Sequence, residues 1–407
     1  SLHGRGGLVN ALLRCFHGRG GVSLSATVYF ASSNFRRPGP VTLNLNTFEP
    51  ENKGTDTMDK RLEKLTYWVH QHPGFDRAHL TPVSGDASFR RYFRATGKDR
   101  LGNSITAIAM DAPPEKENSH PFVALARHWR QHGIAVPDIL ADDLEQGFLL
   151  LEDFGDRLML GRLNGVTADD LYDEAMAELI RIQQAPDSND YPLPPYDEAL
   201  LNREMDLFPD WLLEGLLQME LGDRERCMLD TTFAFLRESA LAQPRVTVHR
   251  DYHSRNLLVR ADTPVPGVID FQDAVNGPIT YDIVSLLKDC YIDWPAARRN
   301  TWLEDFRVMG REAGLHQAES DTFHQWFELM GMQRHLKAAG IFARLYLRDG
   351  KSGYLADIPR TVNYLVEASQ PLPALRHFNQ WLREQVVPAI HHKLGTPPDD
   401  TIEAPHP

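Results

Sequence analysis

Three polar residues near the middle of the chain have types and a spacing that suit one reaction. Asp251 and Asn256 lie five positions apart, and Asp270 follows fourteen residues later. Short apolar runs precede them, so we expect them on loops beside buried strands. A transferring phosphoryl group needs a carboxylate that orients the attacking hydroxyl, and oxygen ligands for a cation that neutralises the phosphates. The spacing therefore predicts a phosphoryl-transfer centre, with Asp251 acting on the hydroxyl and Asn256 and Asp270 binding Mg²⁺.

The order of these residues is typical of kinases, in which H-R-D-x-x-x-x-N precedes the D-F-G aspartate. Because four positions agree, the pattern favours catalysis over a kinase-like module that binds a nucleotide without transfer. His249 is expected to brace the loop rather than to react. Asp282, which opens a helix, is expected to brace the same loop or to cap that helix. Asp273 could equally contact the metal or substrate, or cap a turn.

The elements that position this centre are predicted to form two lobes. Helices are predicted over 58–72 and 121–132, and strands over 89–94, 104–110, near Ile139 and over 148–151. The pattern breaks at 151–155, as a hinge would, and the periodicity is helical from about Ala168 onward. We therefore predict an α+β, two-lobed, protein-kinase-like fold. A small N-terminal β-sheet lobe with helices spans 58–155, and a larger, mainly helical lobe spans 156–407.

A hairpin tip in the first lobe could cover the nucleotide phosphates. Such a loop would use backbone amides and one hydroxyl, which the tip supplies as Gly85, Asp86, Ala87 and Ser88. An ordinary β-hairpin is the alternative.

The third strand, 104–110, carries no lysine, and the helix over 121–132 carries no glutamate to pair with one. Protein kinases have both, so this chain needs a different phosphate contact. Arg90, Arg91 and Lys116 are the candidates, although Lys116 could equally be a solvated loop charge. This departure, with the absence of an A-P-E segment, disfavours a protein kinase.

Five basic residues lie in a helical stretch that ends at Asp349-Gly350: Arg334, His335, Lys337, Arg344 and Arg348. With Ile341, Phe342 and Leu345 as the core face, the basic residues are expected to face solvent. If they border the cleft instead, one arginine could take a substrate carboxylate by a bidentate contact. Four aromatic residues could stack on a sugar ring or, more commonly, pack in the core: Trp211, Tyr281, Tyr291 and Trp294.

Composition narrows the partners. The net charge of −13 over 407 residues argues against nucleic-acid and anionic-membrane binding. Three scattered cysteines cannot build a disulfide or zinc framework, which favours a reducing, cytoplasmic setting. No apolar run reaches the eighteen or so residues of a membrane span. Residues 1–57, without Asp or Glu before Glu49, are expected to be a non-structural leader rather than a targeting signal.

Longer strings around these motifs resemble the aminoglycoside phosphotransferase/choline kinase-like superfamily. Within it they are most similar to the bacterial anomeric kinases that act on N-acetylmuramate and N-acetylglucosamine in cell-wall recycling. The resemblance covers roughly 58–390. It rests on 249–256, 269–274, Gly277-Pro278-x-x-Tyr281-Asp282, 85–92, 110–115, 150–155, and Phe342-Ala343-Arg344 with 348–351.

The resemblance implies ATP and Mg²⁺ as cofactors, and transfer to the C1 hydroxyl of a small amino sugar. It implies an adenine pocket at Glu152, Asp153 and Phe154. The residues expected to contact the sugar are His253, Arg255, Asp273, Arg344 and Arg348. The alternatives are an aminoglycoside, choline or homoserine phosphotransferase of the same fold, or a non-catalytic nucleotide-binding module.

Overall fold

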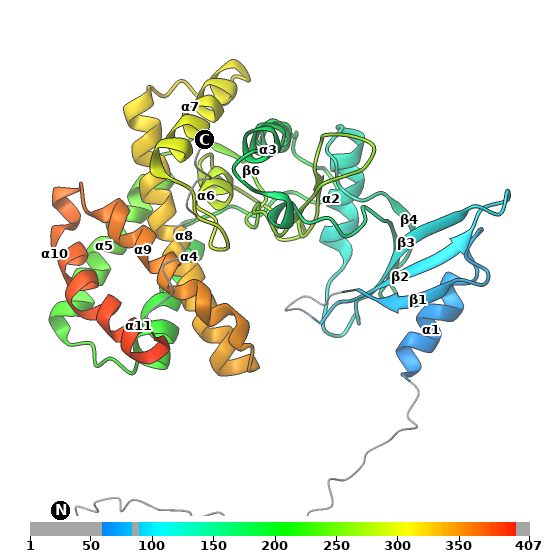
Figure 1. Cartoon of the computed structure of the whole chain (residues 1–407), viewed down its shortest axis with the longest axis horizontal. Helices are drawn as coiled ribbons and strands as arrows, with labels where there is room; N and C mark the ends of the chain where they lie inside the picture. The colour runs from blue at the N-terminus through cyan, green and yellow to red at the C-terminus, as the bar shows by residue number, and fades with distance from the viewer. Residues whose placement is uncertain (1–58, 84–88, 396–407) are drawn as a thin grey trace, which may run out of the picture. The chain divides into compact units, whose positions relative to one another are not determined.

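The computed structural model describes residues 59–83 and 89–395 (Figure 1). The leader expected over 1–57 and the hairpin tip Gly85, Asp86, Ala87 and Ser88 lie outside these residues. The whole site discussed below lies within one unit of the chain, Lys64–Pro407.

The N-terminal lobe is built on one antiparallel sheet with the strand order β1-β2-β3-β5-β4. Its elements are α1 (Lys60–Val69), β1 (His79–Pro82), β2 (Arg91–Lys98), β3 (Ser104–Asp111), α2 (His120–Gln131), β4 (Ile139–Asp143) and β5 (Phe148–Glu152). The helices and strands predicted here are confirmed with shifted ends, and the helix predicted over 58–72 ends at Val69. The strand predicted over 89–94 begins only at Arg91, because Phe89 lies outside the sheet and is 60% exposed.

Helix α2 connects this sheet to the segment that carries Asp270. The ring of Phe122 stacks on Phe271, with 4.8 Å between centroids, and Trp129 lies 5.5 Å from the same ring. Aromatic pairs of this kind contribute about 0.5–1.5 kcal/mol beyond the area they bury. Apolar packing therefore links α2 to Phe271 in a chain that lacks the lysine–glutamate pair of protein kinases.

The C-terminal lobe is mainly helical, as predicted. Its main helices are α3 (Ala168–Gln183), α4 (Glu198–Met205), α5 (Asp223–Leu241), α6 (Tyr281–Leu287), α7 (Ala296–Glu312), α8 (Ser320–Asp349), α9 (Ile358–Ser369), α10 (Arg376–Trp381) and α11 (Val387–Leu394). The 3₁₀-helical segments are η2 (Met159–Arg162), η4 (Ser352–Asp357) and η5 (Pro373–Leu375), and the π-helical segments are η3 (Phe208–Leu216) and η6 (Leu382–Val386). Its strands are β6 (Arg245–Val248), β7 (Leu257–Leu258), β8 (Gly267–Val268) and β9 (Val275–Pro278).

The long helix α8 is the centre of this lobe and packs on α5, α6, α9 and η3 (Figure 1). Gly340 lets it approach Leu207 closely, because a Cβ there would lie 2.3 Å from the Leu207 carbonyl oxygen. The helix ends at Gly350, whose φ of 69° is the left-handed conformation that glycine adopts without strain. The predicted end at Asp349-Gly350 is confirmed.

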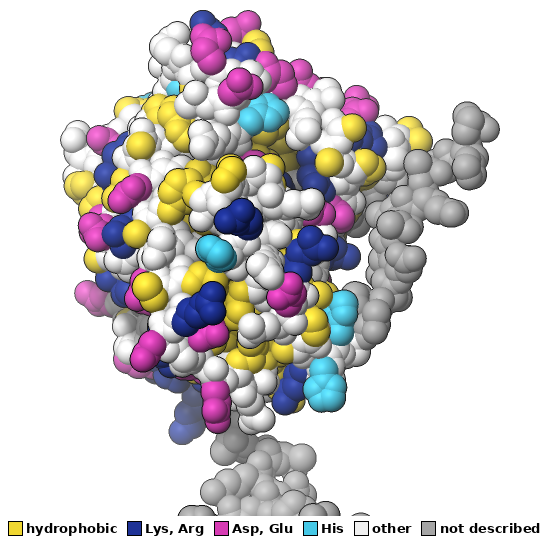
Figure 2. All heavy atoms as spheres, turned by 90° about the vertical axis from the view of Figure 1, so that its left-hand side faces the viewer, with side chains coloured by type: hydrophobic (Ala, Val, Ile, Leu, Met, Phe, Trp, Pro, Cys, Tyr) yellow, Lys and Arg dark blue, Asp and Glu magenta, His cyan; other side chains and the backbone are white. Residues whose placement is uncertain are grey.

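Figure 2 shows the face on the helical side, where acidic and basic side chains are interspersed with scattered apolar ones. Within the described ranges, no helix combines the length and the apolar character that crossing a bilayer requires.

Candidate active site

Strand pairing explains why the three predicted residues meet. The loop 249–256 connects β6 to β7, and Asp270 follows β8. Strands β7 and β8 pair with Leu257 opposite Val268, so the residues just outside this pair are also neighbours. Accordingly, the amide of Ile269 donates to the carbonyl of Asn256 at 3.1 Å. Asn256 Nδ2 lies 3.4 Å from Asp270 Oδ2 and donates to the carbonyl oxygen of Asp251 at 3.0 Å.

Asp282, at the start of α6, holds the loop 249–256 in place. Its carboxyl oxygens accept the amide hydrogens of His249 and Arg250, at 2.6 and 3.0 Å. Of the two roles predicted for Asp282, the structure shows the brace, with no side-chain cap of α6. Burial raises its pKa to about 7.

His249 is fully buried and has a structural geometry. Its Nδ1 accepts the amide hydrogen of Asp251 at 3.2 Å, so Nε2 carries the ring proton and donates to the carbonyl of Ile269 at 3.0 Å. Burial lowers the pKa of His249 to about 4, so the ring is neutral near pH 7. This geometry is that of the brace predicted for His249.

Backbone strain is concentrated at this centre. Among the described residues, only three non-glycine residues have a positive φ, and two of them are Arg250 (78°) and Asp270 (65°). Such conformations cost about 1–3 kcal/mol each and persist only where the surroundings enforce them. Here they turn the loops so that Asp251 and Asp270 flank Asn256.

Asn256 and Asp270 suit a small hard cation. Their oxygens are the ligands that Mg²⁺ prefers, and Mg²⁺ usually takes one or two carboxylates together with phosphates and water. Gln272 Nε2 donates to Asp270 Oδ1 at 2.7 Å and so orients the carboxylate. Over the described part of the chain, no cluster of three or more His, Cys, Asp or Glu could hold a metal. The pair therefore fits a cation shared with nucleotide phosphates.

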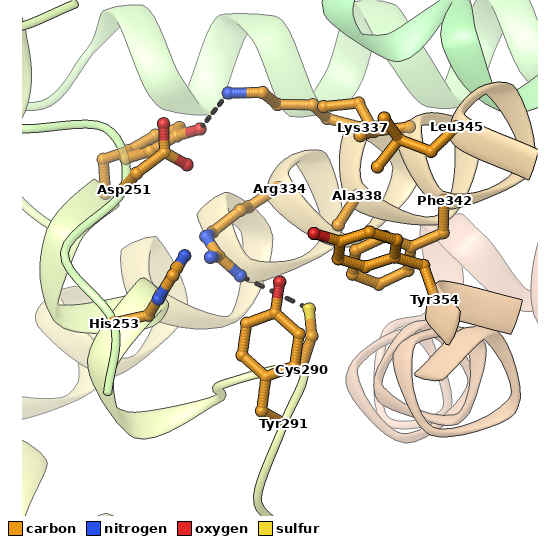
Figure 3. A pocket seen from close by; sticks show the side chains of 12 residues that line it. Asp251, His253, Cys290, Tyr291, Arg334, Lys337, Ala338, Phe342, Leu345 and Tyr354 are labelled. Carbon is orange, nitrogen blue, oxygen red and sulfur yellow. Dashed lines mark hydrogen bonds between the residues drawn. The ribbon is translucent and has the colours of Figure 1, made fainter. Parts of the chain in front are cut away.

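A cavity of about 140 Å³ opens beside Asp251 (Figure 3). Asp251, His253, Tyr281, Cys290 and Tyr291 line it from the catalytic side, and Tyr354 from η4. The rest of the wall comes from one face of α8: Arg334, Lys337, Ala338, Ile341, Phe342 and Leu345. The cavity is polar near Asp251 and apolar where the rings of Phe342 and Tyr354 stack.

The prediction that the basic residues of α8 face solvent is wrong for three of them. Arg334, His335 and Lys337 are only 6, 1 and 8% exposed. The helical periodicity places two of them, Arg334 and Lys337, on the apolar face. Arg334, for example, lies seven and eight residues before Ile341 and Phe342. Residues at this spacing share one side of a helix.

The charges around the cavity hold Asp251 ionised. Burial by itself would raise the pKa of Asp251, but its interactions with Lys337, His253, Arg334 and Arg250 together outweigh burial and lower the pKa to about 2. Lys337 Nζ in turn lies 3.1 Å from Glu204 Oε1 and donates to the Tyr281 hydroxyl at 2.9 Å.

Glu204 of α4 is the centre of a buried network beneath the catalytic loop. It pairs with Arg250 at 2.5 Å and accepts hydrogen bonds from Tyr196 and Gln333. The cations lower the pKa of Glu204 although burial opposes them. Sequence reasoning missed Glu204, because nothing in the local pattern of α4 shows that Lys337 is its partner.

The segment 152–154, the predicted adenine pocket within the hinge predicted over 151–155, begins at the last residue of β5. Asp153 accepts two hydrogen bonds from Arg94 of β2, at 2.6 and 3.0 Å. The Phe154 ring packs on Gly267, where a Cβ would lie 2.4 Å away. The Glu152 carboxylate pairs with Arg130, near the end of α2, at 3.1 Å. These contacts fix the position of the segment 152–154, and its roles as a hinge and as the adenine pocket stay predictions.

The three candidates for the phosphate contact lie close to Phe89 and the start of β2. Arg90 pairs with Glu117 at 3.3 Å, and the Lys116 ammonium lies 4.6 Å from the Phe89 ring centroid. Arg91 pairs with the buried Asp111 at 2.5 Å. The structure therefore brings Arg90 and Lys116 to one place, whereas Arg91 is engaged at the end of β3.

Some of the residues predicted to contact the sugar lie at the cavity, and others do not. His253 lines the cavity, and Arg255 covers the outer side of Tyr291, with its guanidinium 3.9 Å from that ring centroid. Asp273, Arg344 and Arg348 are not among the cavity-lining residues. Asp273 is exposed, and Arg348 pairs with its neighbour Asp349 at 2.8 Å. Of the four aromatic candidates, Tyr281 and Tyr291 line the cavity and Trp294 is buried.

Comparisons with known proteins agree with this geometry. The model of the phosphotransferase enzyme family matches residues 79–319. A relative from Pseudomonas putida, named N-acetylmuramate/N-acetylglucosamine kinase, is 44% identical over 80% of this chain and 97% of its own length. A Pseudomonas aeruginosa relative of the same name is 45% identical over 75% of this chain and 88% of its own.

Solved structures share the fold at low identity. A Plasmodium vivax ethanolamine kinase superposes with a TM-score of 0.53 at 12% identity, covering 73% of this chain and 84% of that one. A choline/ethanolamine kinase family protein from Mesorhizobium loti superposes with a TM-score of 0.52 at 12% identity. The match covers 82% of this chain and 99% of that one. The predicted two-lobed kinase-like fold is confirmed, and the chain belongs to the phosphotransferase enzyme family.

Proposed function

We propose that this protein is an ATP-dependent kinase for the C1 hydroxyl of N-acetylmuramate and N-acetylglucosamine, acting in peptidoglycan recycling. The observation that carries the proposal is the cavity beside Asp251, in which two buried cations and an aromatic wall face the catalytic carboxylate. The names of relatives at 44 and 45% identity support the same acceptors. A cytoplasmic location, where ATP is available, is part of the proposal.

Asp251 would orient the acceptor hydroxyl. The bond from the C1 oxygen to the γ-phosphorus forms as the bond from that phosphorus to the β,γ-bridging oxygen breaks, and Asp251 accepts the hydroxyl proton. A carboxylate with a pKa of about 2 is a weak base. Phosphoryl transfer through a loose transition state depends mainly on positioning and charge stabilisation. An anomeric hydroxyl also loses its proton more readily than an ordinary alcohol.

The other groups would serve the nucleotide. Asn256 and Asp270 would hold Mg²⁺, which supplies positive charge at the phosphate oxygens. The tip 85–88 would cover the phosphates with Arg90 and Lys116 beside it. The hinge 152–154 would contact the adenine.

The charge of the cavity argues against two rival acceptors. Aminoglycosides are polycations and choline carries a quaternary ammonium, which aromatic cages bind well. In the described chain, Asp251 is the only carboxylate that lines this cavity, and it faces Arg334 and Lys337. Neutral or anionic acceptors suit such a wall better. Homoserine carries its own carboxylate, so the charge of the cavity does not argue against it as an acceptor.

The test is a panel of amino sugars, aminoglycosides, choline and homoserine with ATP, measuring ADP release and loss of the reducing end together. We expect both signals with N-acetylmuramate and N-acetylglucosamine, because transfer to C1 removes the reducing end. ADP release with the reducing end intact would assign another hydroxyl. Turnover of an aminoglycoside but of neither sugar would overturn the proposal, and no turnover of any acceptor would favour a non-catalytic module.

A further inference from the structure

Arg334 differs from the other buried arginines of the described chain. Four arginines there are less than about a tenth exposed: Arg90, Arg299, Arg307 and Arg334. The first three each have a carboxylate partner, at 3.3, 2.5 and 2.6 Å respectively. For Arg334, no carboxylate of the described residues lies within the 4.0 Å of a salt bridge, and its hydrogen bond goes to the Cys290 sulfur at 3.6 Å. A thiol is a weak acceptor for a guanidinium.

A buried charge without a partner is costly, so a ligand that supplies the opposite charge gains much from binding there. Arg334 lines the cavity beside Asp251 (Figure 3). Lys337, the other cation of the wall, is already engaged by Glu204 and Tyr281. Arg334 is therefore the cation of this wall that is available to an acceptor.

A carboxylate is the group that matches a guanidinium best, through two parallel hydrogen bonds. The two proposed acceptors differ in this group, because N-acetylmuramate carries a lactyl ether with a carboxylate and N-acetylglucosamine does not. We propose that Arg334 binds the lactyl carboxylate of N-acetylmuramate and so sets the preference of the enzyme between the two sugars. This inference rests on the proposed function.

The test compares both sugars in the same variants at saturating ATP. Arg334→Gln is expected to lower kcat/KM for N-acetylmuramate by about 30-fold or more, mainly through KM, because a buried charge pair loses one partner. For N-acetylglucosamine the change is expected to be much smaller. Arg334→Lys keeps the charge but not the paired geometry, so the ratio of the two kcat/KM values should fall less. Arg311→Gln, an exposed arginine of α7, is the matched control and should leave the ratio unchanged.

An equal loss for both sugars in Arg334→Gln, or no loss for either, would overturn the inference. If Arg334→Gln does not fold, the ratio in Arg334→Lys decides, and a ratio equal to that of the wild type overturns it. A wild-type enzyme that phosphorylates neither sugar would refute the proposed function itself. A wild type active on both sugars, with a ratio insensitive to Arg334, would refute only this inference.

Discussion

The loop 249–256 and helix α8 both place charges at the cavity, but they are built in opposite ways. The loop is short and strained, and its shape is fixed by backbone hydrogen bonds to Asp282 and by the β7–β8 pair. Helix α8 is regular and thirty residues long, and its cations are defined by partners from distant segments. Lys337 faces Glu204 of α4, and Arg334 faces Cys290, which follows α6.

This difference separates chemistry from specificity. The loop and Asp270 are proposed to supply what any phosphoryl transfer of this kind needs, so their spacing can be shared with kinases of other acceptors. The α8 wall, which lines the cavity beside Asp251, is proposed to select the acceptor. Substitutions in the loop should therefore affect every acceptor equally, whereas substitutions in α8 should affect acceptors differently.

The largest effect is expected at Asp251. Asp251→Asn removes the carboxylate that is proposed to orient the hydroxyl and should lower kcat by about 10²- to 10⁴-fold for both sugars, as for other acid–base groups. ATP affinity, measured by calorimetry, should be largely kept because the proposed nucleotide contacts lie elsewhere. Normal turnover in this variant would remove Asp251 from the mechanism. A loss of kcat with only one of the two sugars would contradict the expectation that substitutions in the loop affect every acceptor equally.

A large effect on stability is expected at Glu204. Glu204→Gln leaves Arg250 and Lys337 buried without a carboxylate, so the free energy of unfolding in urea should fall by about 3–5 kcal/mol. Glu214→Gln, which breaks the half-exposed pair of Glu214 with Arg226, is the control and should cost about 0–1 kcal/mol. Equal losses in the two variants would show that the buried network does not stabilise the fold.

The same difference explains how much could be predicted from sequence. The proximity of Asp251, Asn256 and Asp270 could be predicted from spacing, because a loop between paired strands fixes local distances. Glu204 was missed because its partners, Arg250 and Lys337, lie 46 and more than a hundred residues away, and only the packed fold brings them together. The error on Arg334 and Lys337 was avoidable. Their spacing to Ile341 and Phe342 puts them on one helix face with these apolar residues, although charged side chains are mostly exposed.

A smaller effect is expected at Asp270. Because Asp270 is proposed to bind Mg²⁺ directly, Asp270→Asn should raise the Mg²⁺ concentration for half-maximal activity by at least about 100-fold. Loss of a residue that only orients a metal ligand typically lowers metal affinity or activity 10- to 100-fold. Asp273→Asn tests the options left open for that residue, and its exposure predicts a smaller shift. A shift as large as that of Asp270→Asn would assign Asp273 to the metal.

The smallest effect, on the pH profile, links the two regions. Charged neighbours, Lys337 foremost among them, lower the pKa of Asp251 to about 2 against the effect of burial, so the wild-type carboxylate stays ionised throughout the range in which the protein is assayed. Because this pKa is depressed below the ordinary value near 3.9, the stability that Asp251 contributes is present above that value and is lost as the pH falls toward 2. In Lys337→Gln, burial is opposed by less positive charge, and the pKa of Asp251 should rise.

The acidic limb of kcat/KM should therefore move to higher pH in Lys337→Gln. N-acetylglucosamine is the appropriate acceptor for this measurement, because it has no carboxylate that titrates. Lys288→Gln removes another buried lysine, which pairs with Glu328 at 2.5 Å, and is the matched control. It should lower stability without moving the limb. An unchanged limb in Lys337→Gln would mean that α8 sets only the acceptor preference, and that the ionisation of Asp251 is fixed within the loop itself.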